Sequence, residues 1–469
     1  MSSDNPESKN KSKVKPKGNA WALLPMLVLV VIYVGFTILI KTVPVLEQNY
    51  DSVPIVLVFS ITLIFTLFQN RKNSIDKKFG IIGKGIGNTS IIYMIVIFLA
   101  AGIFAGTVGR SSASSVAYFF LDVFPAEWSV LIIFIVSCLV SLAMGTSVGA
   151  ITLITPIAVS VASASGQDLP ICVASVICGS MFGDNLSMIS DTSIAACTGM
   201  GCAPKEKFLE NFKIVLPAAI ITIVLISCLT LGSSNGTKII DSYNMIEFIP
   251  YILVLILSVL GINVLIVLGI GVLSGIVLVL YCTDFDVISL FNNMAQGASS
   301  MSELIVITLI VAGMAALIRA NGGFEYVLYL IERFCKTKKM AQFSTGLMTS
   351  LINFITANNT VAIVVATPIA KEVCASYHIR RRRMASIVDT FSCFVQGLLP
   401  YGAQMMMALL LCQESGYSIN AFDVIPVCFY QYILFAVVLF FIFTGLSDKK
   451  PNWSNKVDGK MNGFKNNKK

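Results

Sequence analysis

Uncharged apolar runs of membrane-spanning length recur along this chain, and they restrict its fold more than any other feature. The first run, residues 20–40, carries no charge and is as long as the roughly 20 residues that a transmembrane helix needs. It exceeds the apolar core of a signal peptide, and no small-residue cleavage site follows it, so we interpret it as a retained span. The chain is 56% hydrophobic and only 12% charged, whereas soluble proteins carry about 25% charged residues. The sequence therefore predicts an all-α polytopic membrane protein with roughly 10 to 14 transmembrane segments.

The basic residues gather in six groups that alternate with acidic loops. These groups hold 30 of the 33 Lys and Arg residues, so the formal net charge of +8 does not indicate nucleic acid as a partner. Cytoplasmic loops of membrane proteins concentrate Lys and Arg. We therefore predict a multi-pass protein of the plasma membrane with both termini in the cytoplasm. In a bacterium this would be the inner (cytoplasmic) membrane. The groups lie at 9–17, 71–84, 205–213, 319–339, 371–383 and 449–469.

Cysteine and histidine are not arranged as metal ligands. None of the twelve cysteines forms a C-x-x-C pair, and the single histidine, His378, adjoins the arginines at 380–383. Zinc sites need clustered Cys and His. We therefore expect the cysteines to act as small buried apolar residues, and we predict no cofactor. The same pattern argues against a membrane-embedded enzyme, which would need a nucleophile with its base or a metal cluster.

The chain contains an internal repeat. Residues 146–158 read TSVGAITLITPIA and residues 358–370 read NNTVAIVVATPIA, with six of thirteen positions identical at an offset of 212 (the repeat offset). Weaker similarity precedes and follows this match at nearly the same offset. The loop at 110–128 is acidic apart from Arg110, whereas the equivalent loop at 319–341 is strongly basic. The two copies are therefore predicted to be inverted relative to the membrane, an arrangement typical of secondary transporters.

Each copy is predicted to combine a helical hairpin with a broken helix. The hairpins are expected at 129–165 and 342–376, and the broken helices at 170–203 and 384–414. Breaks at membrane depth are tolerated where they are buried in protein or line a cavity. The residues expected to mark the breaks are Gly183 in the first copy and Gly397, Pro400 and Gly402 in the second.

The predicted organisation has six parts. They are a basic cytoplasmic tail (1–19), two leading transmembrane helices (20–69), a first transport repeat (91–232), connecting transmembrane helices (246–282), an inverted second repeat (302–445) and a second basic cytoplasmic tail (446–469).

Two aspartates stand inside the apolar broken helix of the first copy, in the stretch GDNLSMISDTSIAA at 183–196. Even lenient scales assign a cost of about 2.5–3.5 kcal/mol to an ionised residue at the centre of a span, so such residues are functional-site candidates. The spacing of Asp184, Ser187 and Asp191 puts them on one face of a helix. Carboxylate, hydroxyl and freed carbonyl oxygens suit a hard cation, and a buried carboxylate holds a proton more readily than an exposed one. One carboxylate can then bind either a proton or a sodium ion. The candidate ligands here are Asp184, Asp191, Asn185, Ser187 and Thr192.

A purely structural role is the alternative for these residues. Asp184 or Ser187 could cap the second half of the broken helix, and Asp191 could pair with a buried donor. Ser187 or Thr192 could also bond back to helix carbonyls. Two carboxylates in one apolar segment favour the site over this alternative.

The second copy offers neutral oxygen ligands that could face the carboxylates across the repeat interface. Asp389 also lies in its broken helix, but the arginines at 380–383 are close, so an ion pair in the cytoplasm is as well supported as a site role. The candidates are Asn358, Asn359 and Thr360 at the hairpin tip, and Asp389, Gln396 and Gln404 in the broken helix.

These motifs resemble those of NhaC-type sodium/proton antiporters in the ion-transporter superfamily. FGDNLSMISDTSIAA (182–196) looks like the family signature, and TANNTVAIVVATPIAKE (356–372) and FSCFVQGLLPYGAQ (391–404) resemble its second-half motifs. Met188 replaces the family's usual proline, and Ser193 its usual threonine. The resemblance, which spans residues 91–445, implies cation/proton antiport, with relatives that exchange malate for lactate. The motif residues that carry over are Gly183, Asp184, Ser187, Asp191 and Thr192.

Three classes of function follow from the sequence. The leading one is a secondary active transporter, a sodium/proton antiporter that works by alternating access with cation/proton competition at a buried carboxylate. The second is an organic-anion exchanger of the malate/lactate type, or a sodium-coupled carboxylate transporter, on the same fold; it would need a cation or helix N-termini near the site, and no Lys or Arg is expected inside a span. The third, a membrane-embedded enzyme, is disfavoured. The predicted partners are sodium ions, protons and the lipid bilayer, and a homodimer is left open.

Overall fold

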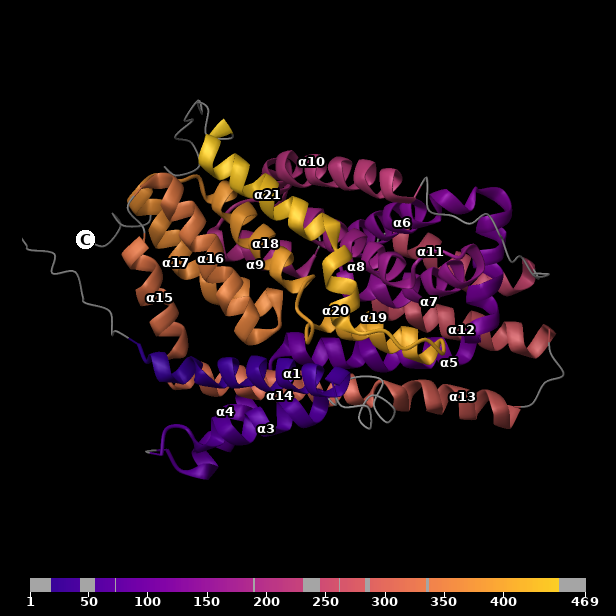
Figure 1. Ribbon diagram of the computed structural model, residues 1–469, viewed down its shortest axis with the longest axis horizontal. Helices are drawn as coiled ribbons and strands as arrows, with labels where there is room; N and C mark the ends of the chain where they lie inside the picture. The colour runs from indigo at the N-terminus through magenta and orange to yellow at the C-terminus, as the bar shows by residue number, and fades with distance from the viewer. Residues whose placement is uncertain are drawn as a thin grey trace, which may run out of the picture.

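The protein is a bundle of helices, most of which run along its long axis (Figure 1). The computed structural model describes residues 18–42, 55–71, 73–188, 190–230, 245–260, 262–282, 287–334 and 337–446. Every regular element in these ranges is a helix, so the predicted all-α polytopic class is confirmed. The predicted basic tails, apart from residues 18, 19 and 446, lie outside the described residues.

The helices fall into two successive series. The first consists of α1 (Leu24–Thr42), α3 (Ile55–Phe68), α4 (Ile75–Ile86), α5 (Thr89–Val123), α6 (Ser129–Met144), α7 (Ser147–Ser165), α8 (Leu169–Leu186), α9 (Asp191–Met200) and α10 (Pro204–Thr230). The second consists of α11 (Ile249–Val259), α12 (Val264–Cys282), α13 (Val287–Ser300), α14 (Ser302–Ala320), α15 (Gly323–Phe334), α16 (Lys338–Thr356), α17 (Asn359–Tyr377), α18 (Arg381–Gln396), α19 (Ala403–Glu414), α20 (Ala421–Val424) and α21 (Phe429–Thr444).

Eight helices among the described residues are long and apolar enough to cross a membrane, and the bent pair Ala421–Val427 and Phe429–Thr444 raises the number to nine. Ala20–Tyr33 and Val56–Phe68 are shorter apolar helices. With these two shorter helices included, the number of possible membrane-spanning helices reaches the lower part of the predicted range of roughly 10 to 14.

A constant offset relates the two series. Helices α4, α7, α8 and α9 begin one repeat offset before α13, α17, α18 and α19 respectively. The first hairpin turns at Gly145 with a φ of 68°, and the second turns at the equivalent position, Ala357, with a φ of 46°. Both turns are in the left-handed region, so the backbone repeats its conformation as well as its element bounds. This agreement supports the internal repeat found at the sequence level.

The two copies pack reciprocally. Helix α9 of the first copy contacts α17 of the second, and α19 of the second contacts α7 of the first. In the same way, α4 contacts α14 and α13 contacts α5. Figure 1 shows the α6–α7 hairpin in the right half of the molecule and the α16–α17 hairpin in the left half. The hairpins therefore approach the centre from different ends.

The helices extend further than the sequence indicates in two places. Helix α5 continues to Val123, so much of the expected loop at 110–128 is helical, and α15 lies within the expected loop at 319–341. Both segments follow a membrane-spanning helix at equivalent positions in the two copies. Charged and polar residues made both segments resemble loops. Such residues can equally belong to helices that continue beyond the apolar part of the membrane.

The break in the first broken helix does not lie at Gly183, as expected, but between Leu186 and Asp191. Gly183 is helical, and its role is close packing. A Cβ atom at Gly183 would lie 2.4 Å from the Leu142 backbone nitrogen of α6 and 2.6 Å from the Cys138 carbonyl oxygen. The glycine therefore permits close contact between α6 and α8. In the second copy, Gly397, Pro400 and Gly402 lie between α18 and α19.

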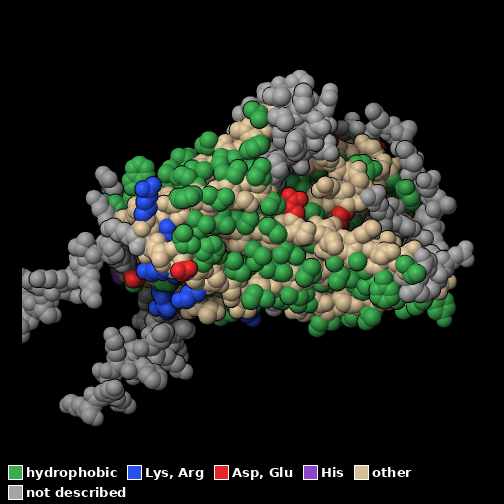
Figure 2. Space-filling model, turned by 90° about the horizontal axis from the view of Figure 1, so that it is seen from below, with side chains coloured by type: hydrophobic (Ala, Val, Ile, Leu, Met, Phe, Trp, Pro, Cys, Tyr) green, Lys and Arg blue, Asp and Glu red, His purple; other side chains and the backbone are tan. Residues whose placement is uncertain are grey.

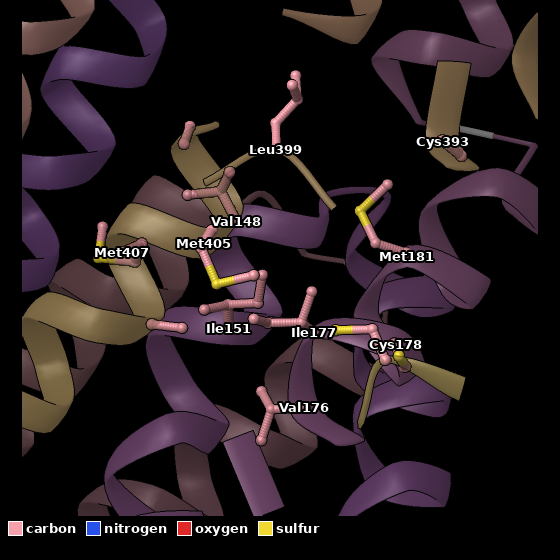
Figure 3. Packing of buried hydrophobic residues seen from close by; sticks show 14 of the residues in the cluster. Val148, Ile151, Val176, Ile177, Cys178, Met181, Cys393, Leu399, Met405 and Met407 are labelled. Atoms are coloured by element: carbon pink, nitrogen blue, oxygen red, sulfur yellow. The ribbon is translucent and has the colours of Figure 1, made fainter. Parts of the chain in front are cut away.

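Buried hydrophobic residues pack around the broken helices. Figure 3 shows Val148 and Ile151 of α7 beside Met405 of α19, with Ile177 and Met181 of α8 nearby. All five side chains are buried. Figure 2 shows one face of the molecule, where hydrophobic side chains are widespread and most of the visible Lys and Arg side chains gather at the left end. The first described residues and the end of α21 also lie at this end in Figure 1.

Candidate functional site

A cavity of about 50 Å³ lies where the two hairpin tips meet the two broken helices. It is lined by residues of both copies, among them Tyr93, Met94 and Ile97 of α5 in the first copy. Six of the eight principal candidates from the sequence line it, together with two of the three secondary ones. These residues are Asp184, Asp191, Thr192, Asn358, Asn359, Thr360, Gln396 and Gln404.

Asp184 is the buried carboxylate of this cavity, with 4% of its surface exposed. It lies in the last turn of α8, close to the end of the helix at Leu186. Ser147 Oγ donates to Asp184 Oδ2 at 2.8 Å, and Thr192 Oγ1 donates to Oδ1 at 3.4 Å. Asp191 lines the same cavity from the first turn of α9, but its side chain is exposed. The two aspartates therefore have different surroundings.

A chain of hydrogen bonds connects the second copy to Asp184. Gln396 Nε2 donates to Gln404 Oε1 at 2.6 Å, and Gln404 Nε2 donates to Ser147 Oγ at 3.0 Å. Ser147 then donates to Asp184. Gln396 Nε2 also donates to the Ala357 carbonyl oxygen at 3.2 Å. The donors in the chain are directed towards the carboxylate, so the second copy stabilises the negative charge of the first.

One hydrogen-bond acceptor in the cavity lining has no donor among the described residues. Both donor bonds of Gln396 fix its amide orientation, because the group that contacts two oxygens must be the nitrogen. Gln396 Oε1 is buried and has no hydrogen-bond partner in the described part of the chain. Buried polar atoms without a partner are rare and call for an explanation. A bound cation would supply one.

The hairpin tips owe their shape to local sequence. Thr146 and Asn358 are the N-caps of α7 and α17, where their side chains accept from the backbone nitrogens of Gly149 and Val361. Asn358 Nδ2 also donates to the thioether sulfur of Met94 at 3.3 Å. Capping side chains satisfy free backbone donors at a helix start. The ends of α6 and α16 and the starts of α7 and α17 are thereby held at the cavity.

Asn185 and Ser187 do not line the cavity, although the sequence favoured both. Ser187 Oγ donates to the Leu142 carbonyl oxygen of α6 at 2.9 Å. The expected common face of Asp184, Ser187 and Asp191 is wrong, because the helix ends at Leu186 and the direction of the chain changes. The Asn185 side chain and carbonyl accept from Asn211 Nδ2 of α10, both at 2.7 Å.

Asp389 is also outside the cavity lining, in a buried ion pair with Lys207 of α10. The expectation that no Lys or Arg lies among the spans is therefore wrong: Lys207 is 1% exposed and lies within electrostatic reach of Asp184. The sequence placed Lys207 in a basic loop because Lys205 and Lys213 flank it. Its i+4 neighbour on α10, Asn211, accepts from Ser386 and Thr390 of α18 and was missed as well.

Ser147 is the most important cavity residue that sequence reasoning missed. It is the repeat equivalent of Asn359, a predicted ligand at the second hairpin tip. The repeat itself could have identified Ser147. Among the described residues, no three His, Cys, Asp or Glu side chains gather as metal ligands, so the sodium hypothesis for Asp184 and Asp191 depends on neutral oxygens as well.

Membrane-length helices in two related series, with broken helices around a buried carboxylate, define the class of secondary transporters. The profile of the Na+/H+ antiporter family matches residues 18–233 and 228–446. The chain belongs to this family, and the resemblance found in the sequence is confirmed.

The chain is similar to three curated antiporters that it matches over most of their length. It is 20% identical over 405 residues to the Na(+)/H(+) antiporter NhaC of Alkalihalophilus pseudofirmus, covering 79% of this chain and 85% of the relative. It is 22% identical over 388 residues to NhaC of Bacillus subtilis, covering 75% and 83%. It is also 20% identical over 391 residues to the malate-2H(+)/Na(+)-lactate antiporter of Bacillus subtilis, covering 75% and 81%.

Proposed function

We propose that the protein exchanges sodium ions for protons across the membrane, with Asp184 as the carboxylate that binds either one. The observation that carries this proposal is the position of Asp184, which is buried in a small cavity between the two copies and surrounded by oxygen-bearing side chains. A buried carboxylate needs a proton or a cation beside it. The family and the named relatives support the same exchange.

The cavity offers a coordination set for sodium. Asp184 supplies the charge, and Ser147 and Thr192 supply hydroxyl oxygens close to it. Gln396 Oε1 supplies a neutral oxygen that lacks a partner among the described residues. The cation-binding set in this proposal is completed by Asp191, Asn358, Asn359, Thr360 and Gln404.

Competition at one carboxylate is sufficient for exchange. When Asp184 is protonated, its charge is absent and sodium loses its main attraction. When sodium binds, the proton must leave, because two positive charges at one buried carboxylate repel each other. If the cavity opens to one side of the membrane at a time, sodium and protons move in opposite directions. Alternating access of this kind is common in transporters with inverted repeats.

Organic-anion exchange is the second candidate, and one relative is named for it. Lys207 removes one argument against this candidate, since a buried cation does lie near the site. However, Lys207 does not line the cavity and is paired with Asp389. The cavity of about 50 Å³ is also far below the roughly 300–1,000 Å³ of typical small-molecule pockets. A small cation fits these observations better than a carboxylate substrate.

We extend the proposal to the organisation of the chain. Each copy would consist of a whole half of the protein, because α12 follows α3 at nearly the repeat offset and the family matches divide the chain at 228–233. The leading and connecting helices would then be equivalent parts of the two copies. The copies would be inverted, with both termini and the basic end in Figure 2 in the cytoplasm of a bacterial cell.

A liposome assay tests the proposed exchange. Purified protein is reconstituted with an internal pH dye, and sodium, lithium, potassium, malate and lactate gradients are applied in turn. We expect sodium to drive proton movement, and we expect malate and lactate to have no effect. Proton movement driven only by the organic anions would replace the proposal with the second candidate. Sodium gradients without any response in folded protein would contradict it.

A further inference from the structure

The ammonium group of Lys207 fills an oxygen-lined position at the break of the first copy's helix. Lys207 Nζ donates to the Asn185 carbonyl oxygen at 2.6 Å and to Ser193 Oγ at 2.6 Å. It also forms the ion pair with Asp389. Asn185 lies at the end of α8, Ser193 lies in the first turn of α9, and Asp389 comes from α18 of the other copy. None of these four residues is more than 1% exposed.

The oxygens around Lys207 are of the kind that coordinates sodium. A carbonyl at the C-terminal end of a half-helix, a hydroxyl and a carboxylate are suitable ligands for a hard monovalent cation at a helix break. The distances to the carbonyl and the hydroxyl are short for hydrogen bonds. Lys207 thus stands where a free cation would find three different oxygen ligands.

The arrangement occurs once in the protein and is not repeated at the equivalent positions of the two copies. The repeat equivalents of Lys207, Asp389, Asn185 and Ser193 are Ile419, Ile177, Gly397 and Met405. None of these side chains can form an ion pair or supply a carboxylate. The fold of a copy therefore does not require the cluster, and a structural need common to both halves does not explain it.

The cluster adjoins the exchange cavity through α9. Thr192 faces Asp184 in the cavity, and the next residue, Ser193, accepts from Lys207. At the end of α8, Asp184 likewise lines the cavity, whereas the carbonyl oxygen of the next residue, Asn185, accepts from Lys207. The two positions are therefore neighbours on opposite sides of one helix break.

We propose that Lys207 is a tethered cation that occupies a second sodium-type site, centred on Asp389. Because this site is filled by the protein itself, only the site at Asp184 is open to exchange. Removal of the ammonium group would expose the second site to a free sodium ion. The inference rests on the proposed function, since it assumes that Asp184 holds the first site.

Binding of radioactive sodium to the purified full-length protein tests this inference. Asp184→Asn should abolish binding, and addition of Lys207→Ala in that background should restore one sodium ion per chain. A third change, Asp389→Asn, should abolish the restored binding. Lys207→Arg, which keeps the charge, and Lys205→Ala, at an exposed lysine on the same helix, should not restore it.

Two results distinguish the inference from the proposed function. If Asp184→Asn alone binds sodium like the wild type, the proposed function fails. If Asp184→Asn abolishes binding but Lys207→Ala restores none, only the role of Lys207 is overturned.

Removal of Lys207 leaves a buried carboxylate without its cation, which destabilises a protein strongly. Thermal unfolding is therefore measured in sodium chloride and in choline chloride. A ligand that binds only the folded state stabilises it, so sodium should raise the Tm of the Asp184→Asn/Lys207→Ala protein, and choline should not. No such rise is expected with Lys207→Arg. Equal unfolding or equal loss of folded protein in both salts would overturn the proposal.

Discussion

Asp184 and Gln396, which are repeat equivalents, line the same cavity. They lie near the ends of α8 and α18, the corresponding helices of the two copies. One copy contributes a carboxylate there and the other a neutral amide. The cavity thereby contains a single buried carboxylate with a neutral oxygen opposite, which is an arrangement suited to one monovalent cation or one proton at a time.

Asp184→Asn should reduce sodium/proton exchange to the level of liposomes without protein. The amide keeps the shape and much of the hydrogen bonding of the carboxylate, but it can neither carry the charge nor release a proton. Asp184→Glu keeps the charge and moves it by one methylene, so reduced exchange should remain. Dye-loaded proteoliposomes provide the measurement. Exchange at the wild-type rate in folded Asp184→Asn would shift the role to Asp191 or Asp389.

Ser147→Ala should weaken the apparent affinity for sodium. The hydroxyl donates to Asp184 and stabilises its ionised form, which is the form that binds sodium. A hydrogen bond to a charged group contributes about 1.5–3 kcal/mol, so the affinity should fall by roughly 10-fold or more. The sodium concentration at half-maximal exchange is the readout.

Ser137→Ala is the matched control for this change. Ser137 is a buried serine on α6 whose Oγ has no hydrogen-bond partner among the described residues. Its removal should leave the apparent affinity unchanged. Equal effects of the two substitutions would show that the hydrogen bond to Asp184 is not responsible.

Acidification should raise the sodium concentration needed for half-maximal exchange. Protons and sodium ions compete for one carboxylate, so more sodium is needed as the proton concentration rises. Saturating sodium should restore the rate, because competition affects affinity and not the maximal turnover. Exchange is measured over a series of pH values and sodium concentrations. A fall in the maximal rate with an unchanged half-saturation concentration would argue against a shared site.

Gly183→Ala should destabilise the protein by about 1–3 kcal/mol through overpacking. The added Cβ would meet backbone atoms of α6 at 2.4 and 2.6 Å, and backbone cannot move aside as a flexible side chain can. Thermal unfolding in detergent measures the change. Gly269→Ala on α12 is the control, because a Cβ there has nothing within 4 Å. The proposal of close packing fails if both variants unfold like the wild type.

A single cysteine at His378 should be labelled from the cytoplasm, and one at Ser418 should be labelled from outside. Both side chains are exposed in the structure, at opposite loop ends of the second copy. The distribution of basic residues is the reason for the assignment. A membrane-impermeant thiol reagent on intact cells gives the readout, and the parent protein, whose native cysteines include exposed Cys228, is labelled in parallel to give the background. Labelling of the His378→Cys variant in intact cells would contradict inverted copies.

The sequence predicts the large elements of this protein well, because they depend on local hydrophobicity. The spans follow from apolar length, and the hairpins follow from the internal match, whose offset also relates the helix starts. The polar residues chosen at the site also lie largely around one cavity. Asp184, Asn359 and Gln396 can be recognised in the sequence because polar groups are rare inside apolar segments.

Predictions from the sequence differ from the structure where tertiary contacts decide the position of a side chain. A glycine inside an apolar span indicates a helix break, but Gly183 is helical, and its missing side chain permits close contact with α6. Ser187 follows the true end of the helix and turns towards Leu142. Lys207 has the neighbours of a loop lysine, but Asp389, on a helix of the other copy, provides its buried partner. Such pairings cannot be read from local sequence.

The reciprocal packing of α9 on α17 and of α19 on α7 has a consequence for how the chain can fold. One segment of the broken helix of each half packs against the hairpin of the other half. The protein thus resembles a domain-swapped dimer whose two subunits have been joined into one polypeptide. A half synthesised alone would lack the helix that covers one face of its hairpin, so we expect the interior of the first half to close only after the second half has been made.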